Sequence, residues 1–134
     1  MDTKIFRISK DFERGKSLLD MSKERLEIIG YIPKDKAYKI IEDYYEIVKE
    51  LLTAIMYIEG YKTLSHVSLI AYFKEHHSEL TENQVQIVDR LRKHRNGIVY
   101  YGKKVTSAYL ENNEDEIKLI IKELVNVIEK ELEN

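Results

Sequence analysis

The chain has 134 residues, of which 43% are hydrophobic and 34% are charged, and its formal net charge is −2 at pH 7. This length and composition favour a single soluble globular domain over a disordered chain. Because the chain contains no cysteine, disulfides, thiolate catalysis and zinc–thiolate sites are excluded. The near-neutral net charge argues against a generally basic nucleic-acid binder, but it is compatible with a local basic site.

The sequence shows neither the pattern of a signal peptide nor that of a membrane-spanning helix. The N-terminal residues contain no apolar core of a signal peptide. The longest apolar run, residues 51–58, is far too short to span a bilayer. We therefore expect a cytoplasmic protein without a membrane partner.

Only one proline and five glycines interrupt the chain, which favours long helices. The first helix is expected at about residues 9–29, closed by Gly30 in a left-handed cap, with Pro33 beyond it. The second is expected at about residues 34–59, where apolar residues recur every three or four positions, and Gly60 is its expected end. Its length and wide apolar face indicate the central helix of a bundle.

Three further helices are expected in the second half of the chain. A loop at residues 61–65 precedes a short helix at about 66–77, and the last helix is expected to start from an N-cap at Asn112-Asn113, followed by acidic residues that suit a first turn. No alternating apolar run supports a sheet. We predict an all-α fold, an antiparallel helical bundle of about five helices with a four-helix up-down core plus a short helix, as a single domain over residues 1–134.

A fourth helix is predicted between the short helix at 66–77 and the last helix. It is expected to begin with a capping box formed by Thr81 and Gln84. Gly97 lies within this helix and costs about 1 kcal/mol relative to alanine, so the helix bends, packs closely or ends early there. Gly102 is the later candidate end. Its buried side is expected to contain Val85, Val88, Leu91, Ile98 and Val99.

Most residues with chemical potential have a simple structural interpretation. His76 and His77 end the third helix, but no HExxH motif or other metal-ligand spacing accompanies them, so we expect no metal or other cofactor. His66 is expected to cap or pack. The 24 carboxylates mostly have lysines at helical spacing, and no isolated pair on an apolar face suggests acid–base catalysis. Core and interface packing, rather than base stacking, is expected for Tyr44, Tyr45, Tyr57 and Tyr61.

The basic segment, residues 90–104, is the exception, because it contains six Lys or Arg, one His and no acid. Beyond Asp89 its cations have no acidic partner of their own on the helix, so they repel one another unless an anion binds. Arginine suits bidentate phosphate contact, and Arg95 directly precedes the helix-weak pair Asn96-Gly97. A solvated helix face is the alternative, but these details favour a phosphate or nucleic-acid contact site.

Arg95-Asn96, followed by residues 97–102 (GIVYYG), resembles the signature of HEPN domains. These are small all-helical domains in which Arg, often followed by Asn, precedes a His after four to six residues. Upstream, Tyr44-Tyr45 and the segment from Gly60-Tyr61-Lys62-Thr63 to Ser65-His66 are similar to the long second helix and its exit in many prokaryotic members. With the order of the helices, the resemblance covers nearly the whole chain.

The resemblance implies a homodimer, or a dimer with a related domain, whose signature helices line a cleft. It implies three possible activities: binding of RNA or a nucleotide, metal-independent cleavage of RNA by a toxin, and pairing with a minimal nucleotidyltransferase in a toxin–antitoxin-type system. We expect Arg95, Asn96 and Tyr100, at the motif positions, to bind RNA or a nucleotide, with support from Arg92 and Lys103 of the basic segment.

The chain departs from the family signature at Tyr100, where His is expected. In the ribonuclease interpretation the His moves protons while Arg95 stabilises charge on the phosphate. An ordinary tyrosine is almost fully protonated at neutral pH, so Tyr100 is a poor general base, although it can donate a hydrogen bond. His94, the possible substitute, precedes Arg95. The sequence therefore favours binding over cleavage, with Arg95 and Tyr100 as the catalytic candidates if the chain does cleave RNA.

Geometry adds one further expectation about this pair. Arg95 and Tyr100 are about 140° apart around an ideal α-helix. We expect their side chains to converge only if the helix bends near Gly97 or a second subunit completes the site.

Overall fold

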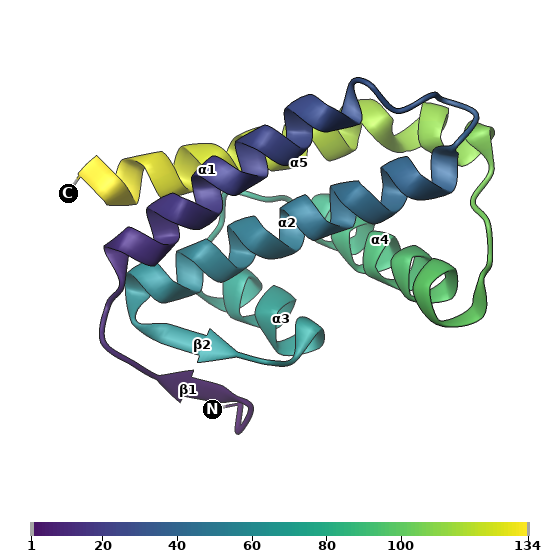
Figure 1. Cartoon of the computed structure of the whole chain (residues 1–134). Helices are drawn as coiled ribbons and strands as arrows, with labels where there is room; N and C mark the ends of the chain where they lie inside the picture. Colours follow the sequence, from purple (N-terminus) through teal and green to yellow (C-terminus); the bar gives the residue numbers. More distant parts are fainter. Residues whose placement is uncertain (1, 134) are drawn as a thin grey trace.

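A computed structural model describes residues 2–133, which form five helices and a two-stranded sheet (Figure 1). The predicted all-α helical bundle is confirmed. None of the helices in this range is long and apolar enough to cross a membrane. In chain order the elements are β1 (Ile5–Arg7), α1 (Phe12–Ile29), α2 (Ala37–Glu59), β2 (Tyr61–Thr63), α3 (His66–His76), α4 (Glu82–Tyr101) and α5 (Ser107–Glu133).

Helix α2 is the centre of the bundle, as its apolar pattern predicts. It contacts all four other helices, with α1 and α5 above it and α3 and α4 below it in Figure 1. Burial of a large aliphatic side chain contributes about 1.5–3 kcal/mol, so this helix supplies much of the stability of the fold. Its fully buried large side chains are Ile40, Ile41, Tyr44, Tyr45, Ile47, Leu51, Ile55 and Met56.

The predicted caps are largely confirmed. Thr81 Oγ1 accepts a hydrogen bond from Gln84 N at 3.1 Å, and Gln84 Oε1 accepts one from Thr81 N at 2.9 Å, which completes the capping box of α4. Gly60 and Gly102 end α2 and α4 with φ angles of +89° and +64°, values that favour glycine. Gly30 differs from the prediction, because it ends α1 in the right-handed region, with φ at −60°.

The short sheet was not predicted. Tyr61–Thr63, expected as part of a loop, pairs antiparallel with Ile5–Arg7, and Ile5 lies opposite Thr63. Strands of three residues are too short to show a period of two in the sequence. Because the chain leaves this sheet before the first helix, α1 begins at Phe12 rather than near Ser9, and the Asp11 side chain caps it by accepting from Arg14 N at 2.9 Å.

The predicted start of the last helix was also wrong. Helix α5 begins at Ser107, before the expected N-cap at Asn112-Asn113. Thr106 Oγ1 accepts from Tyr109 N at 3.2 Å and provides the cap that the sequence analysis assigned to the asparagines. Asn113 instead lies inside the helix, where its side-chain amide donates to the Tyr109 carbonyl at 2.8 Å.

Helix α4 continues through Gly97 to Tyr101. The chain then turns back, and Lys103 N donates to the Gly97 carbonyl at 3.0 Å. Val99, expected on the buried side, is 43% exposed. The last turn of α4 therefore leaves the core and presents its side chains to solvent.

Candidate functional site around Arg95

The basic segment predicted from the sequence occupies the C-terminal half of α4 and the loop that follows it. Arg92 and Lys93 are both paired with the acid that precedes the segment: Arg92 Nη2 lies 3.0 Å and Lys93 Nζ 3.3 Å from Asp89 carboxylate oxygens. These pairs partly neutralise the first turn of the segment. The cationic character is therefore concentrated further along, around Arg95.

Arg95 is half-buried and lies between two tyrosine rings. Its Cζ atom is 5.9 Å from the centre of the Tyr45 ring and 5.8 Å from that of Tyr100, within the range of cation–π attraction. Its Nη1 donates to Asn96 Oδ1 at 3.3 Å, whereas its buried Nε has no hydrogen-bond partner. No carboxylate pairs with Arg95 within residues 2–133. Most of its five N–H donors are thus available to an external acceptor.

The side chains of Arg95 and Tyr100 converge within one chain, although we expected this only with a bend near Gly97 or a second subunit. Helix α4 is continuous past Gly97, and Arg95 and Tyr100 of the same chain make this contact. The long, flexible arginine side chain spans the angular offset between the two positions, which a calculation on helix angles alone does not include.

The structure brings together three of the five predicted binding residues. Arg95 contacts both Asn96 and Tyr100, whereas Arg92 is held by Asp89. Lys103 lies on the turn beyond, with its Nζ 5.8 Å from the centre of the Tyr101 ring. Tyr100 and Tyr101 are 66% and 77% exposed, so two aromatic rings next to the arginine are open to solvent.

Helices α2 and α3 also contribute to this site, and the residues of α4 alone did not predict this. Tyr45 is buried, as predicted for a core residue, but its hydroxyl lies 3.1 Å from His66 Nδ1 while its ring faces Arg95. Burial raises the pKa of Tyr45 to about 12. Burial also lowers the pKa of His66, helped by the charges of Lys49 and Arg95, so His66 is neutral at pH 7. The only sequence signal was the upstream part of the family resemblance, which contains both residues.

His94, considered as a substitute for the missing signature His, lies elsewhere. Its ring centre is 4.2 Å from that of Tyr109 on α5. Burial and the nearby charge of Arg90 lower its pKa. His66 is therefore the histidine that the fold connects to Arg95.

A second group of side chains brings together two carboxylates that the sequence did not indicate as a pair. Glu59 and Glu131 meet beside His77, whose Nε2 lies 2.7 Å from Glu59 Oε2. Although burial acts in the opposite direction, hydrogen bonds from His77, Glu131 and Tyr72 lower the pKa of Glu59 to about 2. Burial, the hydrogen bond to Glu59 and the charge of Glu59 raise the pKa of Glu131 to about 8. These residues are far apart in the sequence, so no local pattern could indicate them.

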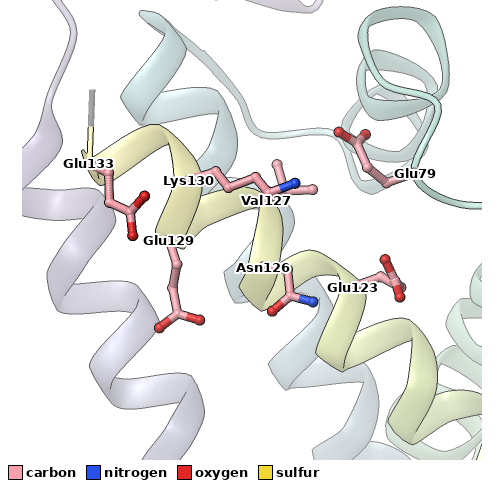
Figure 2. Close-up of a pocket in the computed structure, with 7 residues that line it drawn as sticks. All are labelled: Glu79, Glu123, Asn126, Val127, Glu129, Lys130 and Glu133. Carbon is pink, nitrogen blue, oxygen red and sulfur yellow. The ribbon is translucent and has the colours of Figure 1, made fainter.

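A surface hollow of about 430 Å³ lies next to this acidic group, between α5 and the chain that follows α3 (Figure 2). Four carboxylates and a single ammonium group line this hollow. Its negative charge repels phosphate, so it is not an alternative phosphate-binding site to Arg95. Its lining residues are Glu79, Glu123, Asn126, Val127, Glu129, Lys130 and Glu133.

No known protein family matches the chain, and no curated protein or solved structure matches it. The fold and the site therefore define the protein only as a class: an all-α helical bundle with a local arginine–tyrosine site at the exposed end of one helix.

Proposed function

We propose that this protein is a HEPN-like dimeric domain of the cytoplasm that binds RNA or a nucleotide through Arg95, Asn96 and Tyr100. Arg92 and Lys103 lie at the margin of the site. One observation carries the proposal: a half-buried guanidinium lies between two tyrosine rings and has no carboxylate partner among residues 2–133.

The chemistry of this arrangement suits a phosphate next to a base. The Arg95 guanidinium has no carboxylate partner within residues 2–133, and a phosphate would supply the missing anionic acceptor at its Nη atoms. The fixed guanidinium fork pairs well with two phosphate oxygens. A base attached to that phosphate can stack on an exposed ring such as Tyr100 or Tyr101, a contact that every base can make.

The family resemblance adds two parts to this proposal: a dimer and a partner nucleotidyltransferase. Val99, Tyr100 and Tyr101 form an exposed, partly apolar end of α4 that a second α4 would cover. Two facing basic segments repel each other unless an anion lies between them, so RNA or a nucleotide would strengthen the dimer. Co-purification with the product of a neighbouring nucleotidyltransferase gene tests the partner implied by the resemblance.

Fluorescence anisotropy with a short single-stranded RNA tests the binding site. Loss of charge-assisted hydrogen bonds costs about 1.5–3 kcal/mol, so Arg95→Ala should weaken binding by about 10- to 150-fold. Arg14→Ala is the matched control, because Arg14 also lies over a tyrosine ring, with Cζ 4.7 Å from the centre of the Tyr57 ring. Equal affinity of the wild type and Arg95→Ala would contradict the proposal.

The contact between Tyr45 and His66 favours a second candidate function, metal-independent ribonuclease activity. If His66 Nδ1 donates to the Tyr45 hydroxyl, Nε2 keeps a free lone pair and can take the proton of a ribose 2′-hydroxyl. The 2′-oxygen would then form a bond to phosphorus as the bond to the 5′-oxygen breaks. Arg95 would stabilise the charged phosphate and Tyr100 would donate a proton to the leaving oxygen.

This second candidate makes a different prediction about the histidines. With a fluorogenic RNA substrate and excess EDTA, His66→Ala should lower cleavage by about 100-fold or more, in line with the usual contribution of a general base. His94→Ala should cleave normally, since His94 packs against Tyr109. Unchanged cleavage by His66→Ala would contradict this mechanism, and binding without any cleavage would leave the first function standing alone.

A further inference from the structure

We propose that Glu59, His77 and Glu131 form a binding site for a divalent first-row transition-metal cation, for which Zn²⁺ is the natural probe. The three ligand atoms, a carboxylate oxygen from each glutamate and an imidazole nitrogen, lie within 4.8 Å of one another. One imidazole and two carboxylates are ligands that such cations use. The proposal is independent of the function proposed for Arg95.

The spacing of the ligands is close to that required by a metal ion. Ligand atoms bound to a tetrahedral zinc ion at about 2.0–2.1 Å are separated from each other by about 3.3 Å. His77 Nε2 is 2.7 Å from Glu59 Oε2 and 3.9 Å from Glu131 Oε1, so the two separations lie on either side of this value. Small side-chain rotations would bring all three ligand atoms into coordination distance.

The groups around the ligands support the same interpretation. His77 Nδ1 lies 3.3 Å from Glu79 Oε1, the carboxylate–histidine arrangement that orients a metal-binding imidazole. The Phe73 ring stacks on the His77 ring with centres 4.8 Å apart and fixes its plane. The Tyr72 hydroxyl donates to Glu59 Oε1 at 2.6 Å and leaves Oε2 facing His77.

One oxygen at the site accepts no hydrogen bond within residues 2–133. This atom is Glu131 Oε2, which is buried. A buried carboxylate oxygen without a partner is costly, and a metal ion bound to Glu131 would compensate for this cost. The surrounding field also favours a cation, because the adjacent hollow in Figure 2 carries four carboxylates against Lys130 alone.

The location of the site suggests what the metal ion would do. Glu59 is the last residue of α2, His77 follows α3, and Glu131 lies in the last turns of α5. A bound ion would join the ends of three helices, and it would retain at least one open coordination position for water. A hollow of about 310 Å³ reaches Glu59 and Glu131 and gives access to it.

The test compares metal binding by the EDTA-stripped wild type, Glu131→Gln and two adjacent histidine variants. Zn²⁺ is added, and bound metal per chain is measured by mass spectrometry after dialysis, with the affinity obtained by calorimetry. The wild type should bind about one equivalent with micromolar or tighter affinity, and Glu131→Gln and His77→Gln should each weaken binding at least tenfold. His76→Gln is the matched control, because the adjacent His76 contacts the Tyr72 carbonyl instead.

Folding does not limit this test, because Glu131→Gln keeps the shape of the side chain and its ability to hydrogen-bond. Circular dichroism verifies that each variant is folded before metal is added. The proposal is overturned if the wild type retains no Zn²⁺, if Glu131→Gln binds it as tightly as the wild type, or if His76→Gln loses as much affinity as His77→Gln.

Discussion

The Arg95 site and the Glu59–His77–Glu131 cluster have opposite charges and lie at different places in the same bundle, although α2 contributes a residue to each. The Arg95 site is built mainly from consecutive residues of one helix, and its arginine lacks an anionic partner. The cluster joins side chains from three helix ends, and its carboxylates have too few cationic partners. A buried polar group without a partner can therefore suit an anionic ligand, as at Arg95, or a cationic ligand, as at the cluster. Only the Arg95 site is formed mainly by residues that are close together in the sequence.

The two sites also differ in how firmly they are held. Arg95 rests on Tyr45, a buried residue of the central helix, but the ring of Tyr100 on its other side is exposed. The cluster is enclosed by second contacts from Tyr72, Phe73 and Glu79. We therefore expect the cluster to affect stability and Arg95 to affect binding, whereas Tyr45 belongs to the core and affects stability as well.

The largest expected effect comes from the residue that connects the Arg95 site to the core. Tyr45 is 1% exposed, so Tyr45→Ala should lower the free energy of unfolding by about 3–5 kcal/mol through the cavity it leaves. Tyr45→Phe keeps the ring and should cost about 1 kcal/mol for the hydrogen bond with His66. Urea denaturation measures both. A loss below 1 kcal/mol in Tyr45→Ala would show that the site is not anchored in the core.

The next effect concerns metal removal and should separate the two sites. With free Zn²⁺ at a hundred times its dissociation constant, the wild type should gain about 2.7 kcal/mol of stability, and chelation should remove this gain. Affinity for a short RNA should stay within about twofold, because the ligands of the cluster lie on other elements than α4. Thermal unfolding and anisotropy measure the two quantities. Loss of RNA binding upon chelation would break the separation.

A smaller effect is expected at the margin of the Arg95 site. Lys103→Ala should weaken RNA binding by about three- to tenfold and reduce the slope of log affinity against log salt by about 0.7, as expected for one lost phosphate contact on a single strand. Lys118→Ala, which removes an exposed lysine of α5, is the control. Equal losses in the two variants would indicate nonspecific attraction rather than a site.

The smallest effect is a change in the titration of His66. Burial, together with Lys49 and Arg95, lowers its pKa, so His66 reduces stability as the pH falls below the unfolded-state value of about 6.5. Arg95→Ala removes one of these charges and should raise the pKa of His66, as measured by nuclear magnetic resonance. Arg14→Ala should leave it unchanged. An equal pKa of His66 in the two variants would show that Arg95 is too far from His66 to act with it.

Helical periodicity was sufficient to predict the bundle, since α2 and the capping box of α4 depend on contiguous residues. The sheet of three-residue strands and the cap at Thr106 were missed because each depends on few residues and on contacts formed elsewhere. At the Arg95 site, the sequence indicated Arg95, Asn96 and Tyr100, which lie together on α4.

The remaining features required the tertiary structure. His66 reaches the Arg95 site only because α3 packs on α2 and brings it to the Tyr45 hydroxyl. Glu59, His77 and Glu131 are separated by many residues, and each resembles an ordinary surface side chain when read locally. Long-range contacts of this kind have no periodic signature in a single sequence.

A crystal structure of the protein with a short RNA or a nucleotide tests the central claim most directly. We predict a phosphate with oxygens within about 3.2 Å of the Arg95 guanidinium and a base stacked on Tyr100 or Tyr101. In a dimer, the Arg95 side chains of both copies should face the same cleft. A phosphate bound elsewhere, with Arg95 still enclosed by Tyr45 and Tyr100 alone, would contradict this account.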